Sequence, residues 1–204
     1  LGGYAVDPAV ISPCRAVSLA SLFRAPLDDP EKVFALAKAA RDAGAILCAD
    51  TKVPVYGQRD LREFADTLAL TDYLFPNETE AAYFSCREYS GTSLYDEFMG
   101  MAEPFLELGV GHVVIKAGKN GCFCTDGRNS FMQEAFPVQV VDTTGAGDNF
   151  AAGFISSLLR GEDIRECARF ASAAAAISIQ VTGAVNGITS REQVLTFLEE
   201  QKNG

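Results

Sequence analysis

The sequence predicts an α/β fold, because short apolar runs typical of strands alternate with amphipathic patterns typical of helices. The first strand is expected at residues 17–23 and a second, buried strand at residues 45–49. Between them, Asp29 can cap a helix that has Pro30 in its first turn, and Gly44 is placed to end that helix. This strand–helix–strand order is the start of a layered α/β arrangement.

The rest of the chain continues the alternation. In its middle part the expected elements are a helix at 61–70, a short strand at 73–75, a short helix from Asn77, a helix from about Ser93 to Leu108, a strand at 113–116, a tight turn at 118–121 and a β-meander through 122–125 and 130–135. Towards the end they are a β-type run at 138–141 and an amphipathic helix carrying Phe150 and Phe154. A capping-box-like start at Asp163 and Glu166 follows, then an alanine-rich helical stretch at 168–179 suited to tight packing, and a last helix at 191–200 capped by Ser190.

Length and composition exclude several classes of protein. The 204 residues suit one α/β domain over residues 1–204, and 48% hydrophobic residues allow a buried core. A net charge of −10 argues against nucleic acid or an anionic membrane as partner. No apolar run reaches the length of a membrane span, and no signal-peptide pattern opens the chain. The six cysteines are scattered without a C-x-x-C pair and His112 is the single histidine, so we expect buried, reduced thiols in a cytoplasmic protein rather than a metal site.

Residues 142–153 carry the most specific chemical signal, the run Asp-Thr-Thr-Gly-Ala-Gly-Asp-Asn-Phe-Ala-Ala-Gly. Glycines at a strand-to-helix turn let a ligand approach the backbone, and the first amide groups of a helix are unpaired and partly positive. Such a turn is suited to bind phosphate. A carboxylate at Asp148 would repel phosphate, so its expected role there is to accept a proton. The alternative is an ordinary helix start with Asp148 in its first turn.

The same run resembles the C-terminal signature of the ribokinase-like (PfkB) carbohydrate kinases, Asp-Thr-x-Gly-Ala-Gly-Asp-x-Phe-x-Ala-Gly. The matching residues are Asp142, Thr143, Gly145, Ala146, Gly147, Asp148, Phe150, Ala152 and Gly153. The resemblance implies a three-layer fold with a mostly parallel central sheet flanked by helices and a β-meander before the signature helix. It also implies that Asp148 is the catalytic base and that the amides of Gly145, Ala146 and Gly147 form an anion hole. We expect the N-terminal strands and lid of this family to be absent from this chain.

A second motif is Asn77-x-x-Glu80. By itself it is explained as an N-cap and its capping-box partner. The family, however, has Asn-x-x-Glu at this point, with the glutamate associated with Mg²⁺ and its water shell near the phosphates. The resemblance therefore implies that Glu80 serves Mg²⁺ through water and that Asn77 lies near the nucleotide. Both roles can coexist, since Mg²⁺ retains several of its waters in protein sites.

A third segment, 116–121, resembles the strand and turn that border the nucleotide in this family. Gly118 and Gly121 match its glycines, whereas Lys116 replaces the usual small hydroxyl residue and could contact phosphate electrostatically. A plain hairpin turn remains the alternative. Asp50-Thr51-Lys52, just past a buried strand, partly matches an Asp-x-Asn-x-Arg segment of related kinases. It either touches substrate or phosphate, or forms a solvated turn.

Three further expectations rest on the resemblance. Ser172 and Gly183 would lie on the adenine side of the nucleotide. Asp142 and Thr144, with carbonyls from residues 178–183, occupy the positions of a monovalent-cation site in several members, so K⁺ activation is an open alternative. A homodimer is open as well, because family dimers often form through lid strands.

Together these features predict an ATP- and Mg²⁺-dependent kinase that phosphorylates a hydroxyl of a sugar or sugar-like molecule. The open alternatives are a nucleoside or vitamin-alcohol kinase of the same fold, and a nucleotide-binding but catalytically silent homologue or fragment. A P-loop NTPase is disfavoured because the chain has no G-x-x-x-x-G-K-[ST] motif. A dinucleotide-dependent oxidoreductase is disfavoured because Phe150 stands where a third glycine is required.

Overall fold

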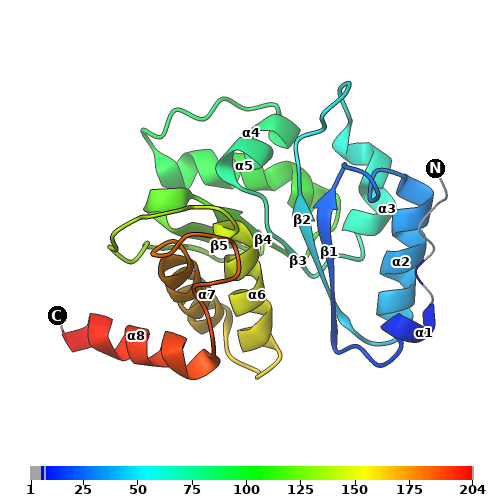
Figure 1. Ribbon diagram of the computed structural model, residues 1–204. Coiled ribbons are helices and arrows are strands. Elements are labelled where there is room, and N and C mark those ends of the chain that lie inside the picture. The colour runs from blue at the N-terminus through cyan, green and yellow to red at the C-terminus, as the bar shows by residue number, and fades with distance from the viewer. Residues whose placement is uncertain (1–5, 7, 204) are drawn as a thin grey trace. The chain divides into compact units, whose positions relative to one another are not determined.

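The computed structural model describes residue 6 and residues 8–203 (Figure 1). They divide into two compact units, each with its own buried apolar residues. The first unit takes in the described residues up to Ile115 together with Phe123–Phe131. The second takes in Lys116–Cys122 and the described residues from Met132 onward. That residues 1–204 form a single domain stays a prediction.

The strands among the described residues form one six-stranded sheet in the order β1-β2-β3-β4-β5-β6. They are β1 (Ala16–Leu22), β2 (Ile46–Thr51), β3 (Tyr73–Leu74), β4 (His112–Lys116), β5 (Cys122–Thr125) and β6 (Ser130–Gln133). The pairs β1–β2, β2–β3 and β3–β4 are parallel, as the alternation of strands and helices predicts. The carboxyl ends of β2 and β3 therefore lie at the same edge of the sheet.

The helical segments of the first unit precede β1 or connect these parallel strands. They are α1 (Pro8–Ile11), α2 (Pro30–Asp42), a 3₁₀ turn (Leu61–Phe64), α3 (Ala65–Leu68), α4 (Glu78–Ser85) and α5 (Leu94–Glu107). Because β1 to β4 are neighbours in chain order and such crossovers are right-handed, α2 to α5 cover the same face of the strands. The side chain of Asp29 accepts a hydrogen bond from the Lys32 amide and caps α2, as predicted.

The helix expected at 61–70 is shorter than predicted. It begins as the 3₁₀ turn and ends at Leu68. The hydroxyl of Thr71 donates to the Thr67 carbonyl at 2.9 Å, the acceptor that the Thr71 amide would need to continue an α-helix. That amide donates to Leu68 instead, and the chain turns towards β3.

The helical segments of the second unit are a 3₁₀ turn (Gly118–Asn120), α6 (Ala146–Leu158), α7 (Ile164–Ser178) and α8 (Arg191–Asn203). Helices α6 and α7 pack so closely that a methyl carbon built at Gly153 would lie 3.1 Å from Ala174 Cβ and 3.2 Å from Ala171 Cα. The alanine-rich pattern of α7 correctly predicted this tight packing. The predicted caps are present as well: Asp163 accepts from two amides of α7, and Ser190 accepts from the amide of Gln193.

The strand expected at residues 138–141 is wrong. These residues have no regular secondary structure, and Val140 and Val141 are each 56% exposed. The amides of Val141 and Asp142 both donate to the carbonyl of Ile179, at 2.8 and 3.2 Å. The end of α7 therefore takes the hydrogen bonds that a neighbouring strand would have taken.

The cysteines are free thiols, and Cys48, Cys122, Cys124 and Cys167 are buried as expected. Cys86 is exposed, so the expectation of burial is wrong for that thiol. Burial raises the pKa of the Cys48 and Cys167 thiols to about 12. Among the described residues, no group of three or more His, Cys, Asp or Glu side chains could hold a metal ion. In that part of the chain no helix is long and apolar enough to cross a membrane.

Candidate active site

The carboxyl ends of β2 and β3 bring polar side chains together in the first unit. Asp50 and Thr51 end β2, and Glu80 lies in the first turn of α4, which follows β3. All three are buried, with exposed fractions of 5%, 0% and 3%. The Thr51 hydroxyl donates to Glu80 Oε2 at 3.3 Å. This edge is where open parallel sheets place ligand-binding groups.

Asn77 and Glu80 form the capping box that their spacing predicts. Asn77 Oδ1 accepts from the Glu80 amide at 2.9 Å, and Glu80 Oε2 accepts from the Asn77 amide at 2.9 Å. The box holds the Glu80 carboxylate at a defined place beside the end of β2. The sequence pattern includes Thr51 in the segment Asp50-Thr51-Lys52 but does not indicate its contact with Glu80.

Lys52 contacts both buried carboxylates. Its Nζ atom lies 3.3 Å from Asp50 Oδ2 and 3.2 Å from Glu80 Oε1. Burial of the ammonium works to lower the pKa of Lys52, but the charges of Asp50 and Glu80 and their hydrogen bonds outweigh it and raise that pKa. Residues 50–52 are therefore not a solvated turn, and Lys52 remains charged at neutral pH.

In the second unit, residues 142–153 form the expected turn into a helix. Gly145 is the N-cap of α6 and has a φ of 76°, in the left-handed region that glycine tolerates best. A methyl carbon there would lie 2.6 Å from Ala184 Cβ. The Asn149 side chain donates to the carbonyls of Gly145 and Ala184, at 2.9 and 2.8 Å. Asn149 thus ties the turn to the 184 loop, a role that its variable place in the signature did not indicate.

The start of α6 presents free donors and an exposed carboxylate. The Ala146 amide donates to the Thr143 carbonyl at 3.2 Å. Within the described chain, the structure gives no acceptor for the amides of Gly147 and Asp148. The Asp148 side chain is exposed, and no described residue forms a hydrogen bond or ion pair with it. The turn can therefore bind an anion, with Asp148 available to accept a proton.

Lys116, the last residue of β4, reaches the same turn. A methyl carbon built at Gly147 would lie 3.3 Å from Lys116 Nζ. The ammonium thus lies against the backbone whose amides are open. A full positive charge beside these amides adds to the attraction for phosphate.

Asp142, Thr144 and Gly183 are also brought together. The Asp142 carboxylate accepts from the Thr144 amide through Oδ1 and from the Gly183 amide through Oδ2, both at 2.9 Å. The Gly183 bond is the first cause, and Thr144 the second, of the lowered pKa of Asp142. Asp142 therefore joins the signature to the loop after α7.

Two other expected contributors have structural roles. Gly121 is required by packing, because a methyl carbon there would lie 1.9 Å from the Gln133 carbonyl oxygen. Gly118 has a φ of 51° and begins the 3₁₀ turn. Ser172 is buried in α7, and its hydroxyl has no hydrogen-bond partner in the described part of the chain. That these residues border the nucleotide stays a prediction.

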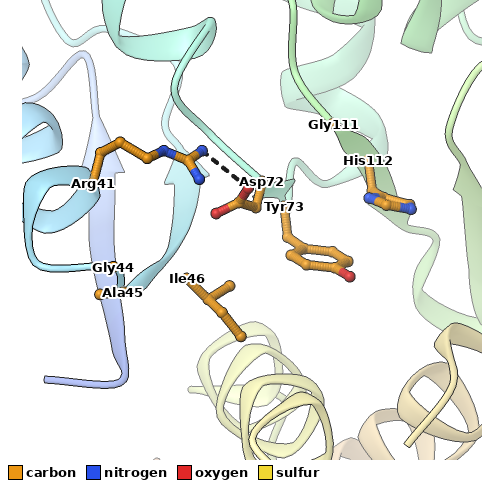
Figure 2. Close-up of a pocket in the computed structure, with 8 residues that line it drawn as sticks. All are labelled: Arg41, Gly44, Ala45, Ile46, Asp72, Tyr73, Gly111 and His112. Atoms are coloured by element: carbon orange, nitrogen blue, oxygen red, sulfur yellow. Dashed lines mark hydrogen bonds and ion pairs between the residues drawn. The ribbon is translucent and has the colours of Figure 1, made fainter. Parts of the chain in front are cut away.

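A pocket of about 360 Å³ opens at the opposite, amino-terminal ends of β2, β3 and β4 (Figure 2). Arg41 pairs with Asp72 there at 3.0 Å, and Tyr73 stacks on His112 with ring centroids 4.7 Å apart. The other oxygen of Asp72 accepts from the Leu47 amide at 2.8 Å. The charged groups of this pocket thus satisfy each other and the backbone, and none of them was predicted to act in catalysis.

The family model described as pfkB family carbohydrate kinase matches residues 9–191. This chain belongs to the pfkB family of carbohydrate kinases. A ribokinase of Haemophilus influenzae is 38% identical over 136 residues, which are 66% of this chain and 43% of that protein. The structure of Arabidopsis thaliana ribokinase complexed with ribose and ATP matches with a TM-score of 0.79 and 30% identity, over 94% of this chain and 58% of that one.

A putative ribokinase II from E. coli, solved in complex with ATP and Mg²⁺, matches with a TM-score of 0.76 and 25% identity, over 96% of this chain and 62% of that one. The chain thus spans between 43% and 62% of the length of these relatives. Its fold is the ribokinase-like one, a three-layer α/β fold with a mostly parallel sheet, as the signature led us to expect.

Proposed function

We propose that this chain carries the nucleotide- and metal-binding part of an ATP-dependent kinase that phosphorylates a hydroxyl of a sugar or sugar-like molecule. The observation that supports it best is the start of α6. There, the open amides of Gly147 and Asp148, the ammonium of Lys116 and the exposed Asp148 carboxylate meet at one turn. Donors for a phosphate and an acceptor for a proton are the groups that phosphoryl transfer to an alcohol requires.

In this proposal the Asp148 carboxylate takes the proton of the acceptor hydroxyl. The hydroxyl oxygen then bonds to the γ-phosphorus of ATP, the bond to the bridging oxygen breaks, and ADP leaves. The amides at the turn, together with Lys116, stabilise the charge on the transferred group. Because these donors are held by the fold before substrate binds, little reorganisation is needed during the reaction.

The residues present fit Mg²⁺ as the accompanying metal. The buried Glu80 carboxylate accepts three hydrogen bonds, which leaves about one of its roughly four acceptor positions. That position suits a water molecule bound to the metal. Asp50 is a second carboxylate beside Glu80. When bound, Mg²⁺ would neutralise phosphate charge.

A K⁺ site at Asp142 is also part of the proposal. Both carboxylate oxygens of Asp142 already accept hydrogen bonds from backbone amides, so the cation would depend mainly on carbonyl oxygens nearby.

The test is transfer of labelled phosphate from ATP to a panel of acceptors, run on the protein as its gene encodes it. The panel includes ribose, other sugars, sugar phosphates, nucleosides and vitamin alcohols, and it is run in KCl and in NaCl. Transfer to a sugar supports the proposal, whereas transfer only to a nucleoside or vitamin alcohol supports the alternative acceptor class.

A catalytically silent, nucleotide-binding protein is the second candidate. ATP binding without transfer to any acceptor in the panel would support this candidate.

A further inference from the structure

Two buried carboxylates of the first unit share one ammonium. Asp50 is 5% exposed and Glu80 is 3% exposed, whereas the Lys52 side chain is 32% exposed. Lys52 Nζ lies 3.3 Å from Asp50 and 3.2 Å from Glu80. With both acids ionised, two negative charges and one positive charge leave a net charge of one negative unit. Lys52 therefore offsets only one of the two carboxylate charges.

The ammonium lies where a cation would have to approach Glu80. Oε2 of Glu80 accepts from the Asn77 amide and from the Thr51 hydroxyl, which together use its two acceptor positions. Oε1 accepts from Lys52 at 3.2 Å and keeps about one position. A metal ion, or a water bound to it, that uses this position would stand beside the Lys52 ammonium.

We propose that the charge of the Lys52 ammonium keeps the affinity of the Asp50–Glu80 pair for divalent cations low in the nucleotide-free protein. This inference rests on the proposed function, in which Glu80 serves the metal of ATP. Removing the ammonium changes the summed charge of the three side chains from −1 to −2. Because a divalent cation is repelled by the ammonium and attracted by the carboxylates, it should then bind more tightly. With Lys52 in place, the metal binds well only when nucleotide phosphates add negative charge, and it enters as the metal–nucleotide complex.

The test measures Mn²⁺ binding to the nucleotide-free protein by calorimetry and by electron paramagnetic resonance. Lys52→Gln is expected to bind Mn²⁺ about tenfold more tightly or better, because repulsion between an ammonium and a divalent ion a few ångströms apart is worth at least that much inside a protein. Asp50→Asn combined with Lys52→Gln restores the charge of −1 and should return the affinity to near the original value. Asp50→Asn alone should bind more weakly than the unchanged protein.

The matched control is Lys38→Gln, which removes an exposed ammonium paired with Asp42 on α2 at 2.8 Å. It should leave Mn²⁺ affinity unchanged. If Lys52→Gln does not fold, Lys52→Met and Asp50→Asn carry the test, and the increase in Tm on adding Mn²⁺ reports the affinity. Equal or weaker Mn²⁺ binding in the Lys52 variants would overturn the inference. It would leave the kinase proposal standing, because that proposal is tested by phosphate transfer and not by metal binding alone.

Discussion

The Lys116 ammonium lies against the Gly147 backbone, since a methyl carbon at Gly147 would be 3.3 Å from Lys116 Nζ. The residues come from the end of β4 and the start of α6, 31 positions apart in the chain. In the pfkB family, a small hydroxyl residue usually stands at the position of Lys116. A lysine there supplies a full charge beside the open amides of the turn.

Replacing Lys116 with methionine should lower kcat/KM for ATP by about 10- to 100-fold, because a hydrogen bond to a charged group is worth roughly 1.5–3 kcal/mol. Steady-state kinetics with varied ATP measure the change. Lys119→Met removes an exposed lysine three residues away and is the control, with an expected change of less than about twofold. Equal effects of the two variants would contradict a contact between Lys116 and phosphate.

Replacing Gly145 with alanine should destabilise the protein more than the same change at Gly161. Both glycines have positive φ, 76° and 80°, so alanine costs about 1–2 kcal/mol at each in backbone strain. Only at Gly145 does the new methyl meet Ala184 Cβ, at 2.6 Å, which should add about 1–3 kcal/mol. Urea unfolding measures both variants. Equal losses would show that the turn does not depend on this close approach.

Glu97 should make stability depend on pH in the acid range. The Ser90 hydroxyl and the Gly91 amide donate to its carboxylate, the hydroxyl being the larger cause, and its pKa is lowered from 4.5 to about 2. Because the folded pKa lies below the unfolded value, the stabilisation is present above pH 4.5 and is lost as the pH falls towards 2. Glu97→Gln should therefore be less stable than the unchanged protein at pH 6, and the difference should shrink between pH 4.5 and 2. Urea midpoints across that range measure it, and a difference that does not vary with pH would contradict the assignment.

Local patterns predicted much of the fold. Asp29, Asn77 and Asp163 cap helices where the spacing of side chains indicates, because a cap depends on residues only two or three positions away. Parallel pairing of β1 to β4 followed from the alternation of strands and helices. The strand expected at 138–141 was wrong because pairing is not local, and the carbonyl of Ile179 takes the hydrogen bonds instead.

In the candidate site, too, only the features that depend on neighbouring residues could be predicted. The signature indicated Asp148 and its turn, since these residues are adjacent in the chain. Contacts that join distant segments could not be predicted from it. Asn149 reaches the Ala184 carbonyl across 35 positions, and Thr51 reaches Glu80 across 29. Such contacts depend on how the loops are packed, which no pattern of neighbouring residues encodes.

In the proposed reaction, the Asp148 carboxylate accepts the proton of the acceptor hydroxyl. The most direct measurement is kcat for phosphate transfer by Asp148→Asn, with ATP binding and unfolding followed in parallel. Because a positioned base contributes about 10²–10⁴-fold to the rate, we expect kcat to fall by that factor. ATP affinity and stability should stay close to those of the unchanged protein, since no described residue pairs with the Asp148 side chain. A near-normal kcat in this variant would show that Asp148 is not the base.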